Sequence, residues 1–172
     1  MVMNKDEALE LLGEALVIER VFGAPRTLVW KTWTEPGLLM RWWGPEGFTA
    51  PVAKIDLREG GAFILCMRSP EGKDYWNSGV YREIVPPKRL VMSVSFTDEK
   101  GKVVPATYYG MSPDIALEMV QAVSFEAEDG KTKVTVEHFG LPPGKDRDDA
   151  RQGWDQSLDK LDRVLASLRD RL

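Results

Sequence analysis

The sequence predicts an α+β fold in which a curved antiparallel six-to-seven-stranded sheet packs around a long C-terminal helix. Two patterns in the chain predict it: a series of strand-length segments broken by turn residues, followed by an amphipathic helical repeat near the C-terminus. A length of 172 residues suits one domain. Sheet and helix each present an apolar face, so we expect the two faces to bury one another.

The composition is that of an ordinary globular protein, with 43% hydrophobic and 29% charged residues. Twenty-three basic and 27 acidic residues are interspersed, which argues against nucleic acid as a partner. No stretch approaches about 20 apolar residues, so no membrane span is expected. The first 14 residues are acidic and unlike a secretory signal. We expect a single cytoplasmic domain over residues 1–172, with residues 1–13 as an N-terminal lead-in.

The N-terminal part predicts one strand and three short helices. Residues 8–12 suit a helical lead-in, and β-branched and apolar residues predict a strand at 15–22. Pro25 fits the first turn of a helix that runs through Trp33. A second proline starts another short helix at residues 36–43, which the following Gly-Pro pair terminates.

The middle of the chain predicts six further strands in an antiparallel meander. Glycine, proline and aspartate between them suit hairpin turns, as in the Glu-Gly-Gly of residues 59–61. The connection at residues 98–114 is longer and unusually apolar and aromatic, which is compatible with a lid. The expected strands cover residues 52–58, 62–68, 75–85, 90–97, 116–127 and 133–139.

The last segment, from about residue 146 to 171, predicts a long amphipathic helix. Acidic residues lie at its start and Arg169 and Arg171 near its end, as the helix dipole favours. Its apolar stripe should lie across the concave side of the sheet. The stripe consists of Trp154, Leu158, Leu161, Leu165, Leu168 and Leu172.

Four separated motifs carry a resemblance to a known family. They are TEPGLLMRWWGP at residues 34–45, DLREGGAF at 56–63, GVYREIVPPKRLV at 79–91, and Gly153-Trp154 at the start of the leucine stripe. In this order they resemble the activator of heat-shock-protein-90 ATPase homologue-like family, part of the START-like or SRPBCC superfamily, from about residue 16 to 168. The resemblance implies a helix-grip fold with two short helices after the first strand and a cavity between sheet and helix.

Strand parity and the resemblance nominate the residues that line the cavity. Alternate residues of a strand face the same side, so each strand contributes one set of inward side chains. Tyr108, in the long connection, could cover the mouth, and Trp154 could form a wall. The candidate ligand-binding residues are Phe63, Leu65, Asn77, Tyr81, Met92, Val94, Tyr108, Met119, His138, Trp154 and Leu158.

His138 is the only histidine, which excludes a metal site built from two or three imidazoles. No cofactor or metal ion is expected, and no residue is assigned as catalytic. Three roles remain open for His138: a hydrogen-bonded core residue, a ligand contact, or a general base. Cys66 lies in an apolar run and is expected to be a small buried residue.

These patterns favour a non-enzymatic carrier or sensor of a small hydrophobic or amphipathic ligand. One alternative is a cyclase- or hydratase-like enzyme acting on a cavity-bound ligand. Another is a chaperone ATPase cofactor, although the eukaryotic co-chaperones of the resembled family carry an additional domain. Trp42 and Trp43 cannot both point the same way. One of them therefore caps the sheet, forms the cavity rim or makes a homodimer contact.

Overall fold

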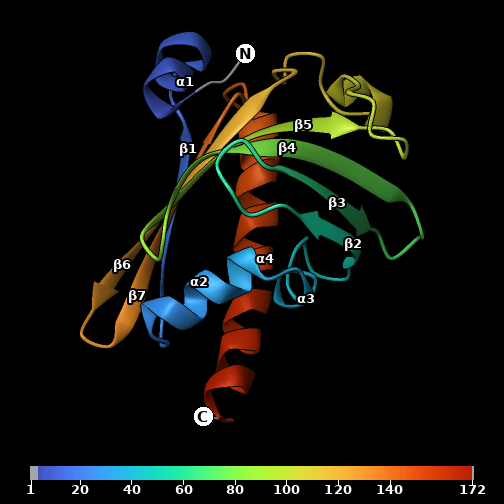
Figure 1. The fold of residues 1–172 in the computed structure, drawn as a ribbon. Coiled ribbons are helices and arrows are strands. Elements are labelled where there is room, and N and C mark those ends of the chain that lie inside the picture. Colours follow the sequence, from blue (N-terminus) through green and yellow to red (C-terminus); the bar gives the residue numbers. More distant parts are fainter. Residues whose placement is uncertain (1–3, 172) are drawn as a thin grey trace.

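The computed structural model describes residues 4–171, and Leu172 of the predicted helical stripe lies outside them. A seven-stranded sheet curves around one long helix (Figure 1). The helices are α1 (Lys5–Leu12), α2 (Arg26–Thr34), α3 (Pro36–Leu39), the 3-10 helix η1 (Ala106–Tyr109) and α4 (Lys145–Arg169). The strands are β1 (Leu16–Phe22), β2 (Thr49–Ile55), β3 (Ala62–Arg68), β4 (Asp74–Val85), β5 (Arg89–Thr97), β6 (Met119–Glu128) and β7 (Lys131–Phe139).

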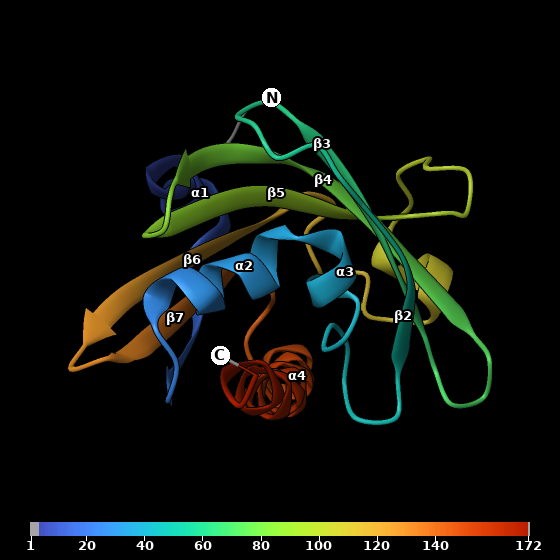
Figure 2. The same cartoon turned by 60° about the horizontal axis from the view of Figure 1, so that its bottom comes forward.

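The sheet is the predicted antiparallel meander, with β1 returning to pair with β7. Its strand order is β1-β7-β6-β5-β4-β3-β2, so β1 and β2 form the two edges. Ile18 lies opposite Val136, which in turn lies opposite Val123, and all three side chains enter the core. The register shifts in β2 and in β4, and such irregularities bend a sheet. Figure 2 shows the resulting arch over α4.

The concave face of the arch is covered by α2, α3 and α4. Trp30 and Trp33 of α2 each meet the ring of Phe125 on β6 edge to face, with 5.4 Å between ring centroids. The amphipathic stripe of α4 supplies Leu158 and Leu161, which are fully buried in the same core. The predicted α+β helix-grip architecture is therefore confirmed.

Helix α1 covers part of the convex face of the sheet. Ala8 packs with Val91, Val120 and Phe139 in a second, smaller apolar cluster. Asn4 caps the helix by accepting a hydrogen bond from the Glu7 backbone N–H at 2.8 Å. Of the helices within residues 4–171, none is long and apolar enough to cross a membrane.

Several predicted boundaries differ from the structure, for example the strand expected at 116–127, which covers 119–128, and two of the differences have clear local reasons. Strand β2 covers 49–55 rather than 52–58, because the hairpin turn already begins at Asp56, whose N–H donates to Ala62. That turn is so tight that a Cβ on Gly61 would lie 2.0 Å from the Asp56 carbonyl oxygen. The helix expected at 36–43 lasts only to Leu39, since the indole of Trp42 turns inward and donates to the Thr32 carbonyl at 2.8 Å.

Candidate functional site

A cavity of about 610 Å³ lies between the concave face of the sheet and the N-terminal half of α4. Its size falls within the range usual for small-molecule sites. Most of the wall is apolar and comes from Trp43, Pro45, Met67, Val94, Phe96, Met111, Ile115, Met119, Leu141, Ala150 and Trp154. The remaining lining residues are Gly44, Asn77, Gly110, Ser112, Gln121, His138, Lys145, Asp146, Asp149, Gly153 and Ser157.

The cavity opens to solvent between the β5–β6 connection and the first turns of α4. The exposed lining residues, Gly110, Lys145 and Asp149, all lie there. The ammonium of Lys145 pairs with the Asp149 carboxylate at 2.6 Å, and this partner raises the pKa of the lysine. Asp146 also lines the opening, so the mouth carries a net negative charge.

His138 lies inside the cavity wall and is held by a second wall residue. The Trp154 indole N–H donates to His138 Nδ1 at 3.1 Å, while His138 Nε2 lies 3.4 Å from the Met119 sulfur. A nitrogen that accepts carries no proton, so this geometry places the proton of the neutral ring on Nε2. Burial lowers the pKa of His138 to about 4. At neutral pH the residue is therefore an uncharged group that orients Trp154.

A much smaller hollow of about 20 Å³ lies deeper, next to the main cavity. It is lined by Trp33, Leu39, Trp43, Phe63, Leu65, Asn77, Tyr81, Met92, Val94 and Gln121. Trp43, Asn77, Val94 and Gln121 line both spaces and so mark their junction. Burial raises the pKa of Tyr81 to about 12, which keeps its phenol protonated.

The junction gathers buried polar side chains on the floor of the site. Asn77 on β4 is 8% exposed and Gln121 on β6 is 6% exposed. Gln121 lies opposite His138 on the neighbouring strand β7, so the two polar groups come from adjacent strands. Among residues 4–171, the buried Asn77 Oδ1 and Trp43 Nε1 atoms have no hydrogen-bond partner.

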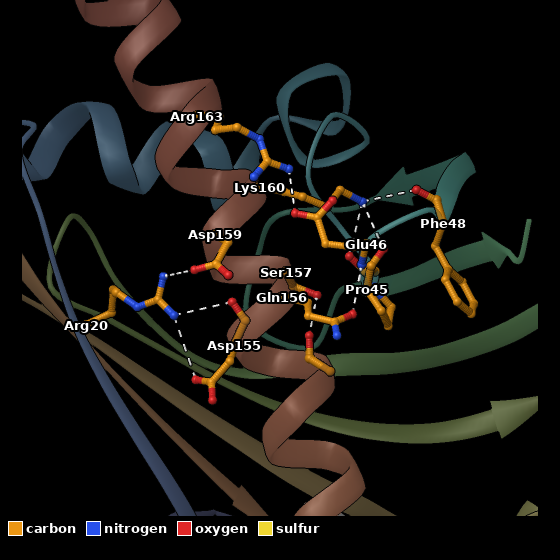
Figure 3. A network of polar contacts seen from close by, with 12 residues as sticks. Arg20, Pro45, Glu46, Phe48, Asp155, Gln156, Ser157, Asp159, Lys160 and Arg163 are labelled. Carbon is orange, nitrogen blue, oxygen red and sulfur yellow. Dashed lines mark hydrogen bonds and ion pairs between the residues drawn. The ribbon is translucent and has the colours of Figure 1, made fainter.

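One wall of the cavity, residues 44–48 before β2, is fastened to α4 by a polar network (Figure 3). Lys160 donates from Nζ to the carbonyl oxygens of Gly44 and Phe48, both at 3.1 Å, and of Pro45 at 3.4 Å. Glu46 forms an ion pair with Arg163 at 2.5 Å. Burial lowers the pKa of Lys160. The side chain of Lys160 thus ties this loop to α4, which forms the neighbouring wall.

The residues predicted from the sequence to bind the ligand lie in four places: the main cavity, the small hollow, the core and the surface. Asn77, Val94, Met119, His138 and Trp154 line the main cavity. Four other nominated residues line the small hollow but not the main cavity: Phe63, Leu65, Tyr81 and Met92.

The other two nominated residues line neither space. Leu158 is fully buried in the core, one residue beyond the cavity-lining Ser157. Tyr108 is 55% exposed. Its neighbour Tyr109 turns inward instead, donating from its hydroxyl to the Thr97 carbonyl at 2.5 Å and accepting from the Trp76 N–H at 3.1 Å.

Some lining residues were missed by the sequence reasoning. Gln121 shares strand parity with Met119 and Val123, so the inward alternation of β6 was the signal that could have found it. Trp43 turned out to be the half-buried member of the Trp42–Trp43 pair, and it lines the cavity. Gly110, Met111 and Ser112 belong to an irregular connection that carries no periodic signal.

Within residues 4–171, no group of three or more histidine, cysteine, aspartate or glutamate side chains is placed to hold a metal ion. Cys66 is buried, and that burial raises the pKa of its thiol. The side chains present are suited to apolar packing and neutral hydrogen bonding.

Comparisons with known proteins agree with this architecture. The family model described as Activator of Hsp90 ATPase homolog 1-like protein matches residues 23–166. Among curated proteins, none matches this chain. A crystal structure of a protein from Nitrosomonas europaea is similar at 25% identity, with a TM-score of 0.74, over 91% of this chain and 97% of that one.

Two further solved structures share the fold. A protein from Chromobacterium violaceum has 24% identity and a TM-score of 0.74, over 88% of this chain and 96% of its own. The AHSA1 protein from Silicibacter pomeroyi has 24% identity and a TM-score of 0.70, over 88% and 97%. The family match covers most of the sequence and the solved structures reproduce the helix-grip arrangement. This chain therefore belongs to the Activator of Hsp90 ATPase homolog 1-like family, within the START-like superfamily.

Proposed function

We propose that the protein binds a small hydrophobic or amphipathic molecule in the cavity between sheet and α4, as a non-enzymatic carrier or sensor. The observation that carries this proposal is the 610 Å³ space with largely apolar walls that opens to solvent. The START-like family to which the chain belongs commonly binds ligands in such a cavity.

The walls provide affinity mainly through burial of apolar surface. Each 100 Å² of apolar ligand surface removed from water contributes about 2.5 kcal/mol. Loss of ligand freedom offsets part of this gain. Aromatic side chains such as Trp154 and Phe96 and the flexible thioethers of Met67, Met111 and Met119 suit ligands of varied outline.

The surroundings of His138 favour binding over catalysis. A general base needs a nitrogen free to take a proton from the ligand, but His138 Nδ1 already accepts from Trp154. The ring nitrogen Nε2 lies against the Met119 sulfur. Its pKa of about 4 makes it a weak base at neutral pH. The cyclase- or hydratase-like alternative therefore receives no support from the one histidine.

Nile red, a neutral apolar dye, provides the test together with one cavity-blocking variant. Ala150 lines the cavity on α4, so Ala150→Trp places an indole in the space. Gln152→Trp adds the same side chain at an exposed position of the same helix that does not line the cavity. Saturable fluorescence enhancement is expected for the wild type and Gln152→Trp, with at least tenfold weaker binding for Ala150→Trp.

Equal dye binding by all three proteins would refute the cavity as the binding site. Native mass spectrometry of the purified protein complements the titration, because a retained lipophile would identify the class of natural ligand. The chaperone-cofactor alternative has a separate readout, the ATPase rate of the cellular chaperone with and without this protein. A rate that rises on addition would favour that alternative.

A further inference from the structure

The junction between the two hollows contains a buried acceptor and a buried donor that lack protein partners. Asn77 is more than nine-tenths buried, and its Oδ1 has no hydrogen-bond partner among residues 4–171. The side chain of Trp43 is half-buried, but its indole Nε1 atom is buried and also has no hydrogen-bond partner among these residues. Buried polar groups in folded proteins are almost always hydrogen-bonded, so two such atoms in one site call for an external partner.

The position of these two atoms fits one small ligand group. Asn77 and Trp43 both line the hollow of about 20 Å³, which is close to the space that a single water molecule needs. They also line the main cavity, which can hold the body of a larger molecule. A hydroxyl has the size for the small hollow, and it can donate to Asn77 Oδ1 and accept from Trp43 Nε1.

The charges around the site favour an uncharged ligand. Among the cavity-lining residues that the structure describes, Lys145 is the only one with a positively charged side chain. It lies at the mouth and pairs with Asp149. His138 is neutral and deep in the wall. A carboxylate placed at the junction would therefore be buried away from any countercharge, which is strongly unfavourable. Asp146 and Asp149 at the mouth add repulsion.

We infer that the site selects neutral alcohols or phenols, with the hydroxyl in the small hollow and the hydrocarbon body in the main cavity. This inference rests on the proposed function and specifies its ligand class. Water can occupy the junction of the empty protein, so a ligand that displaces it has to replace its hydrogen bonds. A hydroxyl does so, whereas an ether replaces one bond and a hydrocarbon none.

Four naphthalene probes of similar shape separate these effects by isothermal titration calorimetry on the intact protein. They are 2-naphthol, 2-methoxynaphthalene, naphthalene and 2-naphthoate. We expect 2-naphthol to bind about tenfold more tightly than naphthalene, with the methyl ether between them, which corresponds to one or two net hydrogen bonds. The carboxylate should bind at least tenfold more weakly than 2-naphthol.

Two substitutions test the assignment of the hydroxyl to its partners. Asn77→Leu removes the acceptor, and Trp43→Phe removes the donor while keeping an aromatic ring. Each should lower 2-naphthol affinity five- to tenfold and change naphthalene affinity less than twofold. Thr97→Val is the matched control, because Thr97 Oγ1 is another buried atom without a partner but lines neither hollow. Its probe affinities should equal those of the wild type.

The outcomes separate this inference from the proposed function. If all four probes bind the wild type equally, the cavity binds ligands but does not select hydroxyls. That result overturns the inference and leaves the proposed function standing. If none binds, and Nile red also fails, the proposed function falls with it. Should a variant not fold, the wild-type order of the probes still decides. Thermal melting checks folding, and Asn77→Leu should melt no lower than the wild type because it removes a buried acceptor that has no partner in the protein.

Discussion

The space under the arched sheet has two ends that differ in how they are filled. At one end, α2 inserts Trp30 and Trp33 between Phe125 and the leucines of α4, and the result is a solid core. At the other end, beneath the β5–β6 connection, the same sheet and helix leave about 610 Å³ unfilled. One fold thus builds a core and a cavity side by side, and the side chains between the layers decide which forms.

Helix α4 shows the difference along its own sequence. The positions that face the cavity include the small residues Ala150, Gly153 and Ser157. Immediately afterwards, Leu158 and Leu161 are fully buried in the core. Small side chains cannot reach across to the sheet, whereas leucines can. Apart from Trp154, whose ring forms part of the cavity wall, the change from small residues to leucines along the helix therefore coincides with the boundary between the open and the filled end.

The largest expected effect is a truncation at the filled end. Leu161→Ala leaves a cavity in a close-packed region and should lower the free energy of unfolding by about 3 kcal/mol in urea titrations. Met111→Ala removes a similar side chain from a wall that already faces empty space, so it should cost under about 1 kcal/mol. Similar losses at both positions would mean that the two ends are equally packed.

Acid should destabilise the protein through His138, which belongs to the open end. Its folded pKa of about 4 lies below the ordinary value of 6.5, so between these pH values the unfolded ring binds a proton and the folded ring does not. Stability is fully present above pH 6.5 and is lost as the pH falls towards 4, by about 3 kcal/mol for a shift of this size.

The variant His138→Gln isolates this contribution, because its side-chain oxygen can still accept from Trp154. The stability of the wild type relative to His138→Gln should decline between pH 6.5 and 4 in chemical denaturation series. Parallel curves for the two proteins over this range would contradict the burial of a neutral imidazole.

A smaller effect concerns the loop that borders the open end. Lys160→Met removes a donor shared by three backbone carbonyls and should lower the free energy of unfolding by about 2 kcal/mol. It should also speed hydrogen exchange of the amides at residues 46–48. Arg163→Met, which removes only the exposed pair with Glu46, should cost under about 1 kcal/mol. If the two variants lose equal stability, the bonds from Lys160 to the loop carbonyls contribute no more than the exposed ion pair of Arg163.

The smallest expected effect is stabilising. A Cβ on Gly153 would meet only Pro45 at 3.7 Å, an ordinary contact, so Gly153→Ala should raise the free energy of unfolding by about 0.5–1 kcal/mol. Gly144 at the start of the same helix has φ +99°, a conformation unfavourable for alanine. Gly144→Ala should therefore destabilise the protein. Thermal melts of the two variants should shift in opposite directions, and a shared sign would contradict this account.

Much of the fold could be predicted from local pattern. Turn residues divided the chain into strands, and the spacing of Trp154, Leu158 and Leu161 identified the long helix. Strand alternation placed Asn77, Val94 and His138 on the concave side, where they line the cavity. These features depend on the period of a single element, which a sequence displays directly.

The outline of the cavity could not be predicted in the same way, because it depends on what lies across from each side chain. Leu158 and Trp154 share one helical stripe, yet Leu158 meets the core and Trp154 meets the open space. Tyr108 and Tyr109 are neighbours in an irregular connection, where no alternation indicates which one turns inward. The position of loop residues such as Pro45 is fixed by Lys160, more than 100 positions away.

The indole N–H signals in a nitrogen-15 correlation spectrum test the contrast between the two ends most directly. The six tryptophans sample both, with Trp43 and Trp154 on the cavity and Trp30 and Trp42 in or beside the filled core. Adding 2-naphthol should shift the signals of Trp43 and Trp154 in a saturable manner and leave those of Trp30 and Trp42 in place. Shifts confined to Trp30 and Trp42, or no saturable shift at all, would contradict the assignment of the open end as the ligand site.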